Sequence, residues 1–184
     1  VNVLFADGSV RFTGASIDGW FALNLTSALH TGLGAWSVQD IADYLKTGSA
    51  PGCSTAFGPM ALVVKNSTSR LSDADLQAMA VYLKDLPANS TLRHNQPAPD
   101  PTKAQGAALY LQYCAGCHQA SGRGIPGVFP PLAGNPVVLA PDPNDIIKVV
   151  DNGVPGRNNF IAMPSFKVQL TDQQMADLAN YVRT

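Results

Sequence analysis

Apolar residues recur at helical spacing in several stretches of the chain, and residues typical of helix ends bound each stretch. Ser37 to Asp40 has the form of a capping box and Gly48 is suited to ending a helix, so a helix is predicted between them. A short helix is expected over residues 60–65. Ser72 caps another over residues 72–85, whose apolar stripe is Leu76, Met79, Ala80 and Leu83.

The second half of the chain shows the same punctuation. Residues 102–105 (Thr-Lys-Ala-Gln) form a capping box that opens a helix running to residue 114, and residues 142–145 (Asp-Pro-Asn-Asp) cap a helix ending near Gly153. In that helix proline takes the first position. Thr171 caps the final helix, whose stripe is Met175, Leu178, Ala179 and Val182. Residues 1–36 carry turn signals and predict loops, so the fold class is all-α.

The two halves repeat one another. Residues 71–84 parallel residues 170–183, and residues 40–48 parallel residues 145–153. A repeat of about a hundred residues indicates two copies of one domain. The proline-rich stretch 87–101 has the composition of a linker, which divides the chain into domains 1–86 and 102–184.

Composition narrows the class of partner. The chain has 184 residues, of which 46% are hydrophobic and 14% charged, with a formal net charge of −1. This balance argues against nucleic acid or a strongly anionic membrane as partner. No apolar run reaches transmembrane length, and no signal peptide is visible. The sequence starts with valine, so a mature or shortened product is expected.

The strongest chemical signal is C-x-x-C-H at residues 114–118, the attachment signature of c-type haem. Cys114 and Cys117 would form thioethers with the two haem vinyl groups, and His118 would bind the iron as the proximal ligand. Two alternatives fit less well. A thioredoxin-like motif needs a βαβ setting, and a zinc site needs four ligands, whereas the only other cysteine is Cys53. Cys53 is expected to be a free thiol, or to pair with a segment outside this sequence.

Met163 is the candidate distal ligand. It lies in a non-helical stretch next to Pro164 and between aromatic residues, which suits presentation of a thioether to a flat cofactor. Met79 and Met175 occupy apolar helical positions and predict core packing.

Residues 102–184 resemble a class I cytochrome c domain. The resemblance rests on Gly106 and Tyr110, the C-x-x-C-H motif, residues 124–132 (Gly-Ile-Pro-Gly-Val-Phe-Pro-Pro-Leu), the Met163 loop and a last helix with Tyr181. It implies that the first and last helices cross at a glycine–aromatic pair. It also implies that a proline carbonyl, from Pro130 or Pro131, orients the proximal histidine.

Over its whole length the chain resembles the multi-haem cytochrome subunit of bacterial membrane-associated alcohol, aldehyde or gluconate dehydrogenases. The matching stretches include residues 19–26 (Gly-Trp-Phe-Ala-Leu-Asn-Leu-Thr), 30–34 (His-Thr-Gly-Leu-Gly), 56–60 (Ala-Phe-Gly-Pro-Met) and 134–136 (Gly-Asn-Pro). The resemblance implies a periplasmic electron relay, peripheral on the outer face of the inner membrane. Electrons would come from a quinoprotein or flavoprotein dehydrogenase subunit and pass to ubiquinone or another acceptor.

The sequence departs from that family by holding one haem motif, because the first copy has no C-x-x-C-H. Three explanations compete: an upstream segment with its own motif, a natural haemless copy, or a product shortened by proteolysis. With an upstream segment Met60 becomes a distal haem ligand; otherwise it is a packing residue. A first copy without its first helix is expected to expose the apolar face of helix 72–85.

Three functions are therefore compared. An electron-transfer protein with His118 and Met163 both bound to iron, free-standing or within a dehydrogenase, is favoured. A haem peroxidase needs an open distal position, which ligation by Met163 denies. A role of the first domain in docking the relay onto a partner would add to electron transfer and would not replace it. His30 and His94 are expected to lie on the surface.

Overall fold

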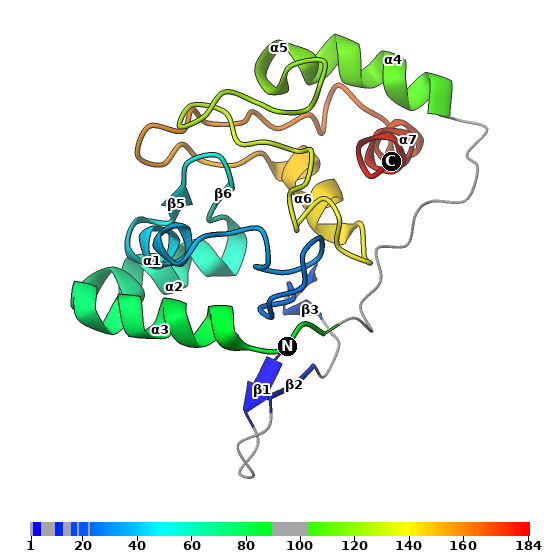
Figure 1. Ribbon diagram of the computed structural model, residues 1–184. Coiled ribbons are helices and arrows are strands. Elements are labelled where there is room, and N and C mark those ends of the chain that lie inside the picture. Colours follow the sequence, from blue (N-terminus) through cyan, green and yellow to red (C-terminus); the bar gives the residue numbers. More distant parts are fainter. Residues whose placement is uncertain (1, 5–9, 13–15, 18, 22, 90–102) are drawn as a thin grey trace.

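The structure is a computed structural model, and it describes every residue except 1, 5–9, 13–15, 18, 22 and 90–102. The described chain is mostly helical, which confirms the predicted class (Figure 1). The helices are α1 (Val38–Thr47), α2 (Gly58–Asn66), the 3-10 helix η1 (Thr68–Arg70), α3 (Asp73–Asp85), α4 (Lys103–Tyr113), α5 (Ala115–His118), α6 (Asn144–Asn152) and α7 (Asp172–Val182).

Short antiparallel strand pairs occur where no strand was predicted. They are β1 (Asn2–Leu4) with β2 (Val10–Phe12), β3 (Ser16–Ile17) with β4 (Trp20–Phe21), and β5 (Ser49–Ala50) with β6 (Ser54–Thr55). In the last pair Ser49 lies opposite Thr55 and Ala50 opposite Ser54. Strands of two or three residues carry too little periodic pattern to be recognised in a sequence.

The predicted helix ends are confirmed wherever a side chain forms the cap. Ser37 and Asp40 form the capping box of α1, and Gly48 ends that helix with φ 77°. Ser72 caps α3, and Thr171 with Gln174 forms the capping box of α7. The predicted α2 begins two residues earlier, at Gly58. Thr102, the predicted cap of α4, lies outside the described residues.

The start of α6 differs from the prediction by one residue. Pro143 is the N-cap of the helix rather than its first residue, and it has no side-chain oxygen to offer. The Asp142 carboxylate accepts a hydrogen bond from the Asn144 backbone N–H at 2.8 Å instead. An Asx turn therefore replaces the ordinary side-chain cap.

One hydrophobic cluster forms where α4, α6 and α7 meet, and a second forms around α1 and α3. We call residues 1–86 the N-terminal half and residues 102–184 the C-terminal half. The division of the chain into two domains stays a prediction, and most of its linker, residues 90–101, lies outside the described residues. Figure 1 shows the two groups of helices stacked on one another.

The crossing of α4 and α7 has the predicted glycine–aromatic contact. A Cβ at Gly106 would collide with the Asp177 carbonyl oxygen and lie 2.7 Å from the Tyr181 Cβ. The rings of Tyr110 and Tyr181 pack with their centroids 5.6 Å apart. Glycine therefore permits the close approach of the two helices.

In each half, a positively charged side chain at the end of the last helix donates hydrogen bonds to backbone carbonyls in the segment before an earlier helix. The Lys84 ammonium donates to the carbonyls of Leu33, Gly34 and Trp36, at 3.3, 2.7 and 2.7 Å. The Arg183 guanidinium donates to the carbonyls of Ala140 and Pro141, at 2.8 and 3.0 Å. These positions correspond in the sequence repeat, so the repeat extends to tertiary contacts.

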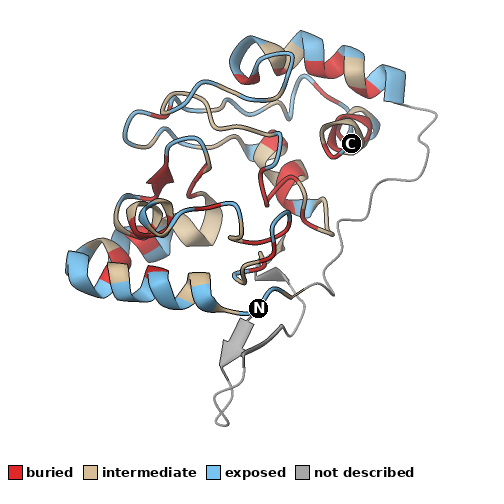
Figure 2. Ribbon diagram, viewed as in Figure 1, coloured by how far each residue is buried: buried red, intermediate tan, exposed pale blue. Residues whose placement is uncertain are grey.

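The outer face of α3 is uncovered, as expected (Figure 2). Leu76 and Ala80 are buried, but Met79 and Tyr82 are 38% and 55% exposed. The prediction that Met79 packs in the core is therefore wrong, because no described element covers this side of α3. Met175 of α7 is buried as predicted. Within the described residues, each helix is too short or too polar to cross a membrane.

Candidate functional site

The C-x-x-C-H motif forms a short helix that continues directly from α4. The backbone N–H groups of Cys117 and His118 both donate to the Cys114 carbonyl, at 3.1 and 2.9 Å. Cys114 is buried and Cys117 is exposed. Burial and the nearby Cys117 raise the pKa of the Cys114 thiol to about 11, so this thiol is protonated at neutral pH. The two thiols thus lie one helical turn apart, as attachment to neighbouring vinyl groups requires.

His118 is buried and oriented by a backbone carbonyl. Its Nδ1 lies 3.0 Å from the Pro130 carbonyl oxygen. Because a carbonyl only accepts, Nδ1 must carry the proton, which leaves the Nε2 lone pair available to a metal. Burial lowers the pKa of His118 and favours the neutral imidazole. Of the two prolines that the resemblance offered, Pro130 makes the contact.

A tight turn after the motif brings the Pro130 carbonyl to the histidine. Gly124 has φ 62°, and its N–H donates to the His118 carbonyl at 2.9 Å. A Cβ at Gly124 would lie 2.7 Å from the Pro130 carbonyl oxygen, so only glycine fits. The Ile125 N–H then donates to the Phe129 carbonyl at 2.9 Å and closes the turn.

Met163 lies on a loop that returns alongside the end of α6. Val154 and Met163 exchange two backbone hydrogen bonds of 2.9 Å each, and Gly153 begins the loop with φ 72°. The Phe166 N–H donates to the Val150 carbonyl at 2.9 Å, and its ring packs edge-on against Tyr113 with centroids 5.9 Å apart. The methionine side chain is half-buried.

A cavity of about 220 Å³ brings the four predicted site residues together: Cys114, Cys117, His118 and Met163 all line it. Most of the remaining wall is apolar and includes Phe129, Ile146, Val150 and Phe160. Two thiols, an imidazole with a free Nε2, a thioether and an apolar wall are the set that covalent haem with His/Met ligation needs. The residues therefore fit the predicted group. Among the described residues no cluster of three or more His, Cys, Asp or Glu side chains suits a metal ion, so the zinc alternative finds no ligands there.

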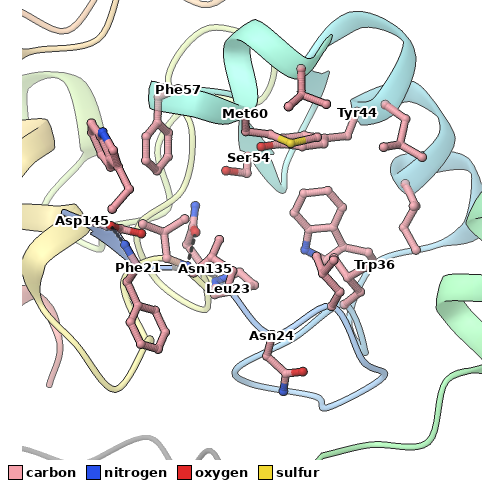
Figure 3. A pocket seen from close by; sticks show the side chains of 18 of the residues that line it. Phe21, Leu23, Asn24, Trp36, Tyr44, Ser54, Phe57, Met60, Asn135 and Asp145 are labelled. Carbon is pink, nitrogen blue, oxygen red and sulfur yellow. Dashed lines mark hydrogen bonds between the residues drawn. The ribbon is translucent and has the colours of Figure 1, made fainter. Parts of the chain in front are cut away.

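A second and larger cavity, of about 410 Å³, is lined mainly by the N-terminal half (Figure 3). Met60 points into it next to the Tyr44 ring, above Trp36, while Phe57 and Asp145 lie at the other end. Its lining corresponds to that of the first cavity in the sequence repeat. Ile41, Leu45, Met60 and Leu83 line the larger cavity where Ile146, Val150, Met163 and Val182 line the smaller one.

Each cavity also has a buried asparagine that holds a turn. Asn24 Oδ1 accepts from the Thr26 N–H at 3.0 Å, and Asn135 Oδ1 accepts from the Val137 N–H at 2.9 Å. No role was predicted for either residue. The signal that was available lies upstream of the capped helix in each half. A leucine precedes the asparagine by one residue in the first half (Leu23) and by three residues in the second (Leu132).

Residues of both halves form the partition between the two cavities. Ser54, Phe57, Asn135 and Val137 line both of them. The Asn135 amide donates to the Cys53 carbonyl at 3.2 Å and to the Pro131 carbonyl at 3.0 Å, which ties the halves together. Cys53 is a free, half-buried thiol whose pKa is raised to about 11 by burial and by Asp40. His30 is exposed as predicted, and His94 lies outside the described residues.

Asp145 forms a further contact between the halves. It is 2% exposed, and its carboxylate accepts a hydrogen bond of 2.7 Å from the Phe21 N–H. Burial raises the pKa of Asp145 to about 6, although the Phe21 hydrogen bond opposes that rise. Beside it, the Lys148 ammonium lies 5.0 Å from the centre of the Trp20 ring.

Comparison with known proteins indicates the same kind of domain. The family model described as cytochrome c matches residues 103–184. Cytochrome c-552 of Thermus thermophilus is 40% identical to the chain, over 45% of this chain and 68% of that protein.

Longer relatives match almost the whole chain. The cytochrome c subunit of alcohol dehydrogenase (quinone) from Gluconobacter oxydans (strain 621H) is 44% identical over 92% of this chain and 38% of that protein. The fructose dehydrogenase cytochrome subunit of Gluconobacter japonicus is 37% identical over 98% of this chain and 43% of that protein. The chain thus spans about two fifths of the length of these relatives.

Proposed function

Because the chain belongs to the cytochrome c family, whose members bind haem c covalently, we propose that it transfers electrons through one haem held by Cys114, Cys117, His118 and Met163. Cys114 and Cys117 hold the macrocycle, and His118 and Met163 supply the axial ligands. The observation that carries the proposal is the convergence of all four side chains on one apolar cavity, with His118 Nδ1 bonded to the Pro130 carbonyl.

The bound haem supplies a one-electron couple, and the residues of the chain set its conditions. The Pro130 carbonyl fixes the tautomer and orientation of the His118 ring, which raises the basicity of Nε2. A thioether as the second ligand raises the reduction potential. The apolar wall keeps water from the site and favours the reduced state, which carries less charge. Such a site serves electron transfer rather than catalysis.

Similarity to dehydrogenase cytochrome subunits supports a place for this electron transfer. The chain is part of a relay that takes electrons from a quinoprotein or flavoprotein dehydrogenase subunit. It passes them to ubiquinone or another respiratory acceptor at the periplasmic face of the bacterial inner membrane. A free-standing periplasmic electron carrier is the alternative, and co-purification of the native protein with a dehydrogenase subunit distinguishes the two.

The haem ligands are tested with Met163→Ala and, as a control, Met79→Leu on the exposed face of α3. The ferric protein is expected to show the red charge-transfer band of methionine-ligated haem, and Met79→Leu retains it. Met163→Ala loses the band and its ferrous form binds carbon monoxide rapidly. Equal spectra for the wild type and Met163→Ala would exclude Met163 as a ligand. Rapid carbon monoxide binding by the wild type would favour a peroxidase-type site.

A second haem in the larger cavity is favoured by the correspondence of its lining with that of the first. Met60 takes the place of Met163 there, and the uncovered face of α3 corresponds to the face of α7 that α4 covers. The C-x-x-C-H motif and the helix for this second site would come from residues outside the 184 of this sequence. Intact mass of the denatured native polypeptide tests this, because thioether-linked haem survives denaturation. One haem per native chain makes Met60 a packing residue, and two or more support its ligation.

A further inference from the structure

The loop that carries Met163 is a narrow hairpin whose tip reaches the N-terminal half. Backbone hydrogen bonds join Val154 to Met163 and Arg157 to Phe160 across the hairpin. At its tip Asn158 has φ 53°, a conformation that asparagine tolerates better than other residues with a side chain. The buried Phe160, just past the tip, lines the cavity with Met163. The tip and the methionine therefore belong to one hydrogen-bonded unit.

Asn158 anchors this tip to the end of α1. Its side-chain amide donates to the Thr47 carbonyl at 3.1 Å and to the Ser49 hydroxyl at 3.0 Å. Thr47 is the last residue of α1, so its carbonyl has no partner within the helix. The amide thus satisfies a helix-end acceptor that would otherwise depend on water.

The neighbouring contacts reinforce the same joint. Gly48, which ends α1, leaves room for the Arg157 side chain, because a Cβ there would lie 2.7 Å from the Arg157 Cδ. The Arg157 cation thereby lies near the negative end of the α1 dipole. On the N-terminal side, Ser54, Thr55 and Phe57 also line the cavity that contains His118 and Met163. The N-terminal half therefore both walls the cavity and holds the loop.

We propose that Asn158 is a positioning residue for Met163, through which the N-terminal half keeps the methionine at the haem. This inference rests on the proposed ligation by Met163. Loss of the anchor frees the hairpin tip, so Met163 leaves the iron more often. The N-terminal half then acts on the haem of the C-terminal half without contributing a ligand to it.

The test uses the haem-loaded full chain with Asn158→Ala, with Asn159→Ala as a matched control on the exposed neighbour at the same tip. Cyanide binding to the ferric haem requires Met163 to dissociate, so its rate reports how often the methionine is released. One or two lost hydrogen bonds predict that Asn158→Ala binds cyanide about three- to tenfold faster. Asn159→Ala stays within about twofold of the wild type, as for other surface substitutions.

Ser49→Ala removes one acceptor from the other side of the joint and provides a second, independent variant. In a double-mutant cycle its acceleration is smaller than that of Asn158→Ala, and the double variant is no faster than Asn158→Ala alone. Additive effects of the two substitutions would contradict the direct contact. Equal acceleration by Asn158→Ala and Asn159→Ala would overturn the anchor in favour of general loosening of the loop.

The two proposals fail in different ways. If the wild type shows the methionine charge-transfer band but Asn158→Ala binds cyanide at the wild-type rate, the anchor is wrong and the ligation stands. If the wild type lacks the band and binds cyanide without a ligand-release step, the ligation by Met163 is wrong. Haem content per chain, measured for each variant, excludes loss of cofactor as the cause of any rate change.

Discussion

The crossing of α4 and α7 provides a sharp test of packing, through the substitution Gly106→Ala. A Cβ at this position meets the Asp177 carbonyl oxygen and lies 2.7 Å from the Tyr181 Cβ. The first of these is a backbone atom, so relief requires the two helices to move apart. Overpacking of this kind costs about 1–3 kcal/mol, and rigid neighbours place the cost near the upper end.

Helix propensity opposes this cost. Replacing glycine by alanine within a helix gains up to about 1 kcal/mol. The difference leaves a net loss of about 2 kcal/mol in the free energy of unfolding. For a chain of 184 residues that corresponds to a fall in Tm of roughly 4–8 °C.

The assay is urea and thermal unfolding of the ferric haem protein, followed by far-ultraviolet circular dichroism. Gly116→Ala is the matched control, because a Cβ at Gly116 has no atom within 4 Å and the residue is also helical. It is expected to be neutral or slightly stabilising, with both haem-attachment cysteines intact. A Gly106→Ala protein as stable as the wild type would refute the close crossing, since propensity alone predicts a gain.

Three further predictions concern single side chains. The pKa of Asp145 is raised from 3.8 to about 6 in the folded protein, so the contribution of this group to stability is fully present below about pH 4. It is lost as the pH rises through 6, by about 3 kcal/mol. Asp145→Asn, which keeps an oxygen for the Phe21 N–H, removes that loss, and urea titrations from pH 4 to 8 check it; an unchanged pH slope would contradict the shift. Asn135→Ala removes the donor to the Cys53 and Pro131 carbonyls and the acceptor for Val137, and is expected to lower the free energy of unfolding by about 1–3 kcal/mol. Thr171→Ala removes the capping box of α7 and lowers the same quantity by about 1 kcal/mol, measured with Asp172→Glu as the surface control.

The structural features that depend only on neighbouring residues could be predicted from the sequence. Caps such as Ser37 and Thr171 act over three or four positions, so their pattern can be read directly, and the haem motif is equally local. The proline carbonyl that orients His118 was predicted to within one residue through the family resemblance. Pro143 is the N-cap of α6 and not its first residue, one position from the prediction, because Asp142 caps the helix through an Asx turn. The two local arrangements have similar energies, so the sequence does not distinguish them.

Contacts between the halves could not be predicted in this way. Asn158 bonds to Thr47 and Ser49 across more than a hundred residues, and nothing in the sequence around either end indicates the other. The same holds for Phe57, which lines the cavity of His118 although it belongs to the other half. Hydrophobic periodicity identifies the buried face of an element but not the element that covers it.

The two last helices show why that distinction matters. A hydroxyl side chain caps both α3 and α7, their apolar stripes lie at corresponding positions, and Tyr82 corresponds to Tyr181 in the sequence repeat. Leu178 of α7 is 2% exposed because α4 crosses there at Gly106, whereas its counterpart Met79 of α3 is 38% exposed. Equal patterns thus give unequal burial, and the difference comes from the partner helix. Among the described residues, no helix covers the apolar side of α3 as α4 covers that of α7.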